Sequence, residues 1–299
     1  MKKYLVPLLV SSILLLLSSC AGRTPIEGEY WFQALGEEGE FVLTADVSRF
    51  RSGEGSEIVD SSLFDSSVAS RAERISLSLV PQDGESEEYP LPLSKFITGG
   101  AVEGSFPKFV VNSSLKFSGY RKVKENGITR YRGDGNSIYA PFKNLILFTN
   151  GDYDYLYRKT IEEREKLIDD QTAYYMASSL FSVYVFEPET LVDIGFDIPK
   201  TVLSEMTRTC LLFDEKDGEL VMSGRIETTG DGTARALSTL FKNQIVQEKR
   251  RNGEKLDTKA LSGMFATEGN VVGIFYYPLS GTMKEKAREL MSEGIGGLF

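Results

Sequence analysis

The chain has 299 residues, with 34 Lys and Arg against 43 Asp and Glu and no histidine, which gives a formal net charge of −9. This acidic balance argues against nucleic acid or an anionic lipid surface as partners, because both favour clustered Lys and Arg. The absence of histidine excludes Ser-His-Asp and Cys-His catalysis and His-ligated zinc or copper, and leaves carboxylate, Lys and Tyr chemistry open.

The first 19 residues have the pattern of an export signal. Lys2 and Lys3 precede an apolar run from Leu5 to Leu17, and two serines follow it. As a helix this run extends about 20 Å, which is short of the roughly 20 residues that a bilayer core requires. The pattern therefore predicts a cleaved signal peptide and not a transmembrane helix.

The signal ends at Leu17-Ser18-Ser19-Cys20, which resembles the lipobox of bacterial lipoproteins. The resemblance implies that Cys20 receives a diacylglyceryl group on its sulfur, that the signal (1–19) is cut before Cys20, and that the new amino group is acylated. Each buried CH₂ contributes about 0.8 kcal/mol, and stable anchoring requires more than one acyl chain. Two or three acyl chains on Cys20 would therefore anchor the protein. An ordinary signal with an incidental cysteine is the alternative.

The lipobox resemblance also sets the expected location. Residues 20–29 contain small residues and a proline without periodicity, and we expect them to form a tether between Cys20 and the folded body. The protein is then expected in a bacterial cell envelope, bound to a membrane through acyl chains on Cys20. Ala21 follows the cysteine and acidic retention residues are absent, which favours the outer membrane where one exists.

Strand and helix patterns alternate from residue 30 onward. Strands are expected where apolar residues alternate or cluster, helices where they recur every three or four residues, and tight turns at Asp-Gly and Asn-Gly pairs. The expected strands of the first half are 40–45, 75–79, 119–123, 128–132, 136–140 and 144–149, the expected helices are 61–74, 104–117 and 151–168, and the expected turns are at 83–84, 126–127 and 134–135.

The second half repeats this order. Arg74 is followed nine residues later by Asp83-Gly84, and Arg208 nine residues later by Asp217-Gly218. The strands that begin near Phe41 and Leu145 have counterparts near 183 and 274. We therefore predict an α+β fold made by tandem duplication of a β-α-β-β-α unit, with antiparallel sheets and helices packed on them. The expected halves are 30–170 and 171–299.

No motif of common catalytic or cofactor machinery occurs. The sequence contains no P-loop, no G-x-G-x-x-G, no G-x-S-x-G and no CxxC. If Cys20 is lipidated, Cys210 is the remaining thiol, and its apolar neighbours predict a buried, inert side chain. We expect no catalytic residue, no cofactor and no metal ion. The oxygen-rich segments 150–155 and 214–219 do not fit a calcium loop and indicate a helix start and a turn.

Two short motifs resemble functional motifs, and each also has a structural explanation. Arg132-Gly133-Asp134 resembles the integrin-binding tripeptide of adhesion proteins, and the Asp-Gly pair predicts an exposed hairpin tip. Ser113 and Lys116 fit the S-x-x-K motif of penicillin-binding enzymes, one helical turn apart, but the companion S-D-N and K-T-G motifs are absent and the neighbouring apolar residues indicate a packing face.

The sequence thus predicts a lipid-anchored envelope protein with a non-enzymatic binding or scaffolding role, for an envelope protein, glycan or lipid. An envelope hydrolase that uses carboxylates or Ser113 and Lys116 is one alternative. A surface adhesin that presents Arg132, Gly133 and Asp134 is the other. The aromatic clusters, such as Tyr30-Trp31-Phe32 and Tyr174-Tyr175, are expected to pack at a sheet or to line a groove.

Overall fold

The computed structural model describes residues 30–36, 41–58, 69–81, 96–188, 199–251, 253, 258–279, 284–285, 287–288 and 291. Cys20, the expected tether and the expected turn at 83–84 lie outside these residues, as does most of the helix expected at 61–74.

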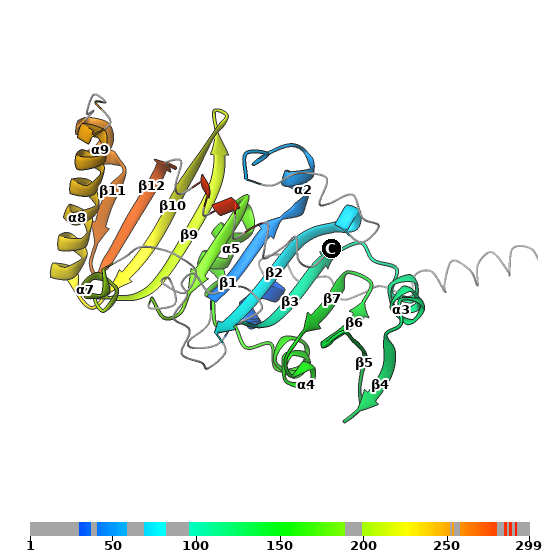
Figure 1. The fold of residues 1–299 in the computed structure, drawn as a ribbon. Helices are drawn as coiled ribbons and strands as arrows, with labels where there is room; N and C mark the ends of the chain where they lie inside the picture. Colours follow the sequence, from blue (N-terminus) through cyan, green and yellow to red (C-terminus); the bar gives the residue numbers. More distant parts are fainter. Residues whose placement is uncertain are drawn as a thin grey trace, which may run out of the picture.

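One antiparallel sheet of twelve strands extends through the described part of the chain (Figure 1). Its strand order is β11-β12-β10-β9-β8-β1-β2-β3-β7-β6-β5-β4. The mixed α and β composition with antiparallel pairing confirms the predicted fold class. The strands are β1 (Phe41–Asp46), β2 (Ala72–Pro81), β3 (Phe96–Gly104), β4 (Arg121–Glu125), β5 (Ile128–Gly133), β6 (Asn136–Phe142), β7 (Leu145–Thr149), β8 (Phe181–Val185), β9 (Met206–Lys216), β10 (Glu219–Thr228), β11 (Phe265–Glu268) and β12 (Val271–Pro278).

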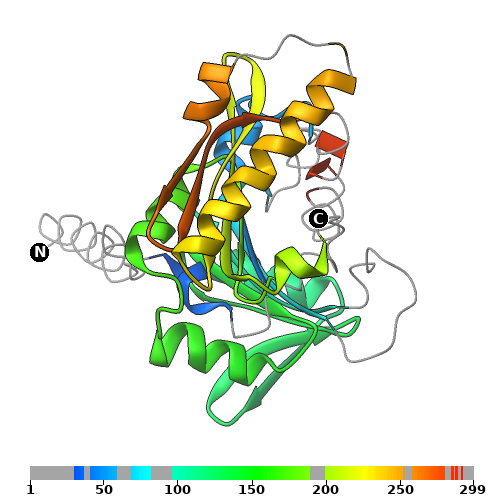
Figure 2. The ribbon, with the colours of Figure 1, turned by 90° about the vertical axis from the view of Figure 1, so that its left-hand side faces the viewer.

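Helices lie on both faces of the sheet (Figure 2). One face, here called the α5 face, carries η2 (Trp31–Ala34), α4 (Tyr153–Tyr157), the π-helix η6 (Arg158–Glu163) and α5 (Asp170–Ser178). The other, the α8 face, carries α2 (Val47–Arg51), α3 (Lys108–Phe117), α7 (Lys200–Leu203) and α8 (Asp231–Arg251). The remaining elements are η4 (Ala69–Arg71) and α9 (Thr258–Gly263).

The central strands are buried on both sides, which explains their apolar sequences. In β1, Phe41, Leu43 and Ala45 belong to the core on the α8 face, whereas Val42 belongs to the core on the α5 face. Because strand side chains alternate between faces, one apolar run fills both cores.

Three tight hairpins form where the sequence predicts them. Asn126 and Gly127 join β4 to β5, Asp134 and Gly135 join β5 to β6, and Asp217 and Gly218 join β9 to β10. Both residues of each pair have positive φ, between 50° and 82°. This is the type I′ geometry, which follows the right-handed twist of the paired strands and favours Asn or Asp followed by Gly.

Helix boundaries differ from the prediction at three places. Ala72–Arg74, expected in a helix, begin β2. Gly104, expected in a helix, ends β3, and α3 begins only at Lys108, after Pro107. A Cβ at Gly104 would lie 2.2 Å from the Arg71 carbonyl oxygen, so a side chain is not tolerated there. The helix expected at 151–168 changes from α to π at Arg158 and ends at Arg164.

The two halves of the sheet are arranged alike on either side of the β1–β8 pair. Moving outward, β1-β2-β3-β7 on one side corresponds to β8-β9-β10-β12 on the other. The three pairs of similar segments in the sequence fall on β1 and β8, β2 and β9, and β7 and β12, in agreement with a duplicated topology. Because β1 pairs directly with β8, both halves share one continuous sheet. The division at residues 170 and 171 stays a prediction.

Candidate binding surface

Helix α3 begins and ends at clear sequence signals. Pro107 precedes its first residue with φ −65°, a conformation that suits a helix start. At its end, Gly119 has φ +90°, its N–H donates to the Lys116 carbonyl, and the Tyr120 N–H donates to the Leu115 carbonyl. This Schellman motif ends the helix because glycine adopts the left-handed conformation without steric cost.

The inner side of α3 is fixed to strand β6. Val111 packs against the core of the α8 face. The Asn112 side-chain oxygen accepts a hydrogen bond of 3.3 Å from the Ala140 N–H, and Lys108 Nζ donates one of 2.8 Å to the Pro141 carbonyl. These contacts set the rotation of the helix about its own axis, and so determine which residues face outward.

The outer side of α3 carries large apolar side chains. Phe109 is 81%, Val110 54% and Phe117 89% exposed. At about 100° per residue, these three positions fall within one sector of about 100° on the helix, with Ser113 between them. Isolated exposed apolar residues are ordinary, but two phenylalanines and a valine along one helix side form a patch, which is typical of an interaction site.

Lysines border this apolar patch. Lys116 is exposed on α3, and Lys122 and Lys124 are exposed on the edge strand β4. In β4, Val123 is opposite Arg130, whose guanidinium contacts Asp154 of α4 on the α5 face. Strand alternation therefore places Lys122 and Lys124 on the face that carries α3. Charges on an edge strand also prevent edge-to-edge pairing, a role these lysines fulfil without a partner.

We call Phe109, Val110, Lys116, Phe117, Lys122 and Lys124 the α3 surface. An ion cluster around the buried Arg130 holds the β4–β5 hairpin in place beside it. The Arg130 side chain, 6% exposed, contacts the carboxylates of Glu125 and Asp154, and Asn126 Nδ2 donates to Asp154 Oδ2 over 3.1 Å. Breaking such a buried pair is strongly unfavourable, so the position of the hairpin is well determined.

The S-x-x-K pair lies within the α3 surface. Lys116 is exposed and Ser113 is half-buried on the outer side of the helix. Neither residue lines the pocket beside Trp31 or the pocket bordered by Leu43 and Met291. A Lys base requires a neutral amine, which burial would favour. The geometry supplies no such burial for Lys116.

Arg132, Gly133 and Asp134 lie at the tip of the β5–β6 hairpin. Arg132 is opposite Ser137 near the end of β5, and both Arg132 and Asp134 are exposed. Gly133 ends β5, where a Cβ would lie 2.9 Å from the Tyr120 ring. The predicted hairpin presentation of the tripeptide is confirmed. A structural need for Gly133 also explains part of the motif.

Cys210 is buried on β9, as its apolar neighbours predict. Burial raises the pKa of its thiol to about 12, so the reactive thiolate is scarce near neutral pH. The acidic segments have structural partners: Asp152 caps α4, and Asp214 forms an ion pair of 2.8 Å with Arg49. Within the described ranges, no group of three or more Cys, Asp or Glu residues is arranged to hold a metal ion.

The sequence prediction missed the exposed side of α3. It assigned Val110 to the same packing face as Val111 and Leu115, whereas Val110 is 54% exposed. The signal was the helical spacing itself, because Phe109 and Phe117 lie on the side opposite Val111. Some residues of the aromatic clusters are buried and others are exposed. Trp31, Phe32 and Tyr153 are buried, whereas at least half of the surface is exposed in Tyr155, Tyr174, Tyr175 and Tyr276.

Comparisons with known proteins support the fold alone. The sequence matches no protein-family model and no curated protein. The fold resembles that of TP0453. Its crystal form I has 11% identity and a TM-score of 0.54, covering 89% of this chain and 98% of TP0453. Form IV has 14% identity and a TM-score of 0.55, with 87% and 96% covered. At this level of identity only the architecture is shared.

Among the described residues, no helix is both long enough and apolar enough to cross a bilayer.

Proposed function

We propose that this protein is a lipid-anchored component of a bacterial envelope that acts by binding another envelope protein through the α3 surface. The lipobox-like Leu17-Ser18-Ser19-Cys20 supports the anchor. The observation that carries the binding role is the exposure of Phe109 and Phe117, at 81% and 89%, on a helix whose other side is fixed to the sheet. An enzymatic role finds no comparable support in the described residues.

The partner's chemistry follows from the composition of the α3 surface. Phenylalanine is a frequent anchor at the centre of protein interfaces, where it fills an apolar pocket. Lys116, Lys122 and Lys124 would meet carboxylates at the rim, which would favour fast and specific association. We therefore propose a partner with an apolar groove bordered by acidic residues. The net charge of −9 disfavours an anionic bilayer as the binding partner.

Photo-crosslinking in living cells tests this proposal. A photoreactive phenylalanine analogue would replace Phe117, and a matched control would carry it at Tyr174, which is 58% exposed on the opposite face of the sheet. We expect a discrete protein adduct from position 117 and none from position 174, and its loss with Phe109→Ser. Adducts only to lipid, or equal labelling from both positions, would contradict a protein partner at the α3 surface.

The exposed hairpin tip favours adhesion as a second candidate function. Arg132 and Asp134 would have to lie outside the cell, so protease treatment of intact cells is the first test. Binding of the purified protein to immobilised integrin should then be abolished by Asp134→Glu, which keeps the charge but lengthens the side chain. Protection of the hairpin in intact cells, or unchanged binding of the variant, would rule adhesion out.

A further inference from the structure

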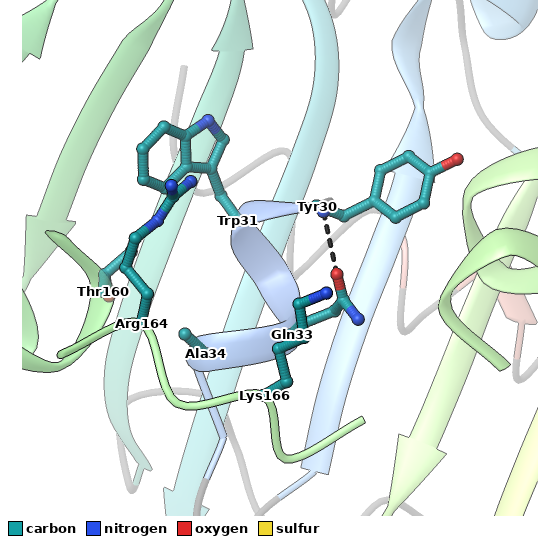
Figure 3. Close-up of a pocket in the computed structure, with 7 residues that line it drawn as sticks. All are labelled: Tyr30, Trp31, Gln33, Ala34, Thr160, Arg164 and Lys166. Carbon is teal, nitrogen blue, oxygen red and sulfur yellow. Dashed lines mark hydrogen bonds between the residues drawn. The ribbon is translucent and has the colours of Figure 1, made fainter. Parts of the chain in front are cut away.

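A small pocket lies on the α5 face between η2 and the chain that joins η6 to α5 (Figure 3). Its empty volume is about 320 Å³, including its open mouth. Because this volume includes open solvent, the enclosed space is much smaller, and the pocket suits only a molecule of few atoms. Its walls are Tyr30, Trp31, Gln33, Ala34, Thr160, Arg164 and Lys166.

Both walls of the pocket are firmly held. Gln33 Nε2 donates to the Ile168 carbonyl over 3.0 Å and to Asp170 Oδ1 over 2.9 Å, and Gln33 Oε1 accepts from the Tyr30 N–H over 2.9 Å. The Leu167 N–H donates to the Gln33 carbonyl over 2.9 Å. The bonds of Gln33 with Leu167, Ile168 and Asp170 join segments more than 130 residues apart in sequence, so the pocket is formed by the fold and does not depend on a loose loop.

The backbone at the pocket adopts two uncommon conformations. Residues 158–163 form a π-helix, a geometry that is frequent at functional sites. Arg164 follows in the left-handed region with φ 53°, which places its guanidinium 4.4 Å from the centre of the Trp31 ring. Figure 3 shows the Arg164 side chain lying against the indole of Trp31. A non-glycine residue in this region costs about 1 kcal/mol or more, and such strain clusters at ligand sites.

Among the described residues, two buried polar groups on side chains that line this pocket have no hydrogen-bond partner. They are the Trp31 Nε1–H, on a side chain 3% exposed, and the Thr160 hydroxyl, which is fully buried. An unsatisfied buried polar group is unfavourable, so each is a reason to expect a further partner. The oxygen and the nitrogen of the Gln33 side-chain amide both already have hydrogen-bond partners. Gln33 therefore offers no acceptor to the unsatisfied groups, and donors predominate in the pocket walls.

The charges at the pocket favour an anion. Arg164 and Lys166 line it, and the acid beside its mouth, Asp170, already accepts from Lys166 Nζ over 2.8 Å and from Gln33. These two hydrogen bonds lower the pKa of the Asp170 carboxyl below its ordinary value, so it stays ionised and does not itself act as a donor. A ligand rich in acceptor oxygens would complement these donors.

We propose that this pocket binds a small anion with carboxylate or phosphate oxygens, which accept a hydrogen bond from the Thr160 hydroxyl beside the charges of Arg164 and Lys166. The same oxygens occur in free metabolites and in lipid headgroups. The pocket is separate from the α3 surface and does not depend on the lipid anchor.

Trp31 is the only tryptophan of the chain, so its fluorescence reports directly on the pocket. The soluble body would be titrated with inorganic phosphate, succinate and glycerol 3-phosphate, with sodium chloride as the control for ionic strength. A parallel titration with vesicles that contain phosphatidic acid distinguishes a headgroup from a free anion. We expect a saturable change in emission with at least one of these probes, and none with chloride.

Variants test the assigned residues. Thr160→Val keeps the shape and removes the hydroxyl, and Arg164→Gln removes the charge; each should weaken binding at least tenfold. Arg158→Gln changes an exposed residue of the same π-helix outside the pocket walls and should bind as the parent does. In the absence of anion, Thr160→Val should melt no lower than the parent, because it removes an unsatisfied hydroxyl.

Two results would overturn this site. One is the lack of a saturable response to every probe up to about 10 mM, where binding energy falls to a few kcal/mol. The other is binding by folded Thr160→Val and Arg164→Gln that equals binding by the parent.

Discussion

Replacement of the exposed phenylalanines of α3 should leave the stability of the protein almost unchanged. Phe117 is 89% and Phe109 81% exposed, so 11% and 19% of their surface is buried. Full burial of a phenylalanine contributes about 3 kcal/mol, which gives about 0.3 and 0.6 kcal/mol for the buried parts. Alanine has the higher helix propensity and offsets much of this loss. We expect Phe109→Ala with Phe117→Ala to change the free energy of unfolding by less than about 1 kcal/mol.

The assay is urea unfolding of the soluble body, with Phe181→Ala as the matched control. Phe181 is 1% exposed and its ring stacks on Phe213 at 4.1 Å between centroids. Its truncation should therefore cost about 3–5 kcal/mol. If the α3 variant lost more than about 2 kcal/mol of its free energy of unfolding, α3 would not be an exposed binding surface. Such a loss would mean that another part of the chain covers this helix.

Three further predictions concern the core and a helix cap. Gly100→Ala should destabilise by about 1–3 kcal/mol, since its Cβ would lie 2.2 Å from the Phe148 ring, whereas Gly99→Ala, with its nearest neighbour at 3.4 Å, should cost less; urea unfolding compares the two. Burial raises the pKa of the Cys210 thiol from 9.0 to about 12, so Cys210 should react with a thiol reagent about 1,000-fold more slowly than an exposed thiol. The rate would be measured on a form of the protein with no other cysteine. Rapid labelling before unfolding would contradict this prediction. Asp152→Ala should cost about 1 kcal/mol through loss of the α4 cap, and Asp152→Asn should retain most of it in the same assay.

Local signals in the sequence were sufficient for β1, β2 and β4 to β7 and for the turns at 126–127 and 134–135, whereas β3 was not predicted. Asn126-Gly127 and Asp134-Gly135 define hairpins because few other residues adopt two consecutive positive φ angles. The repeated order of segments agrees with the matching strand order on either side of the β1–β8 pair. The place of Gly104 in a strand was missed because its pairing partner Ala72 and its close neighbour Arg71 are distant in sequence.

The α3 surface and the pocket beside Trp31 could not be predicted from the sequence, because both depend on contacts between residues that are distant in sequence. The α3 sequence has apolar residues on two sides, and only its contacts with β6 decide which side is exposed. The pocket beside Trp31 depends on Gln33 meeting Asp170, 137 positions later. Nothing in either local sequence indicates that pairing. The π-helix before Arg164 likewise follows an ordinary helical pattern in sequence.

Mass spectrometry of the N-terminal peptide from purified membranes can establish whether Cys20 carries a lipid anchor. We predict a peptide that begins at Cys20 and carries a diacylglyceryl group on sulfur and an acyl group on the amino nitrogen. Cys20→Ala should leave the protein uncleaved at this site and without lipid. An unmodified Cys20 in the mature chain, or cleavage at another residue, would contradict the account.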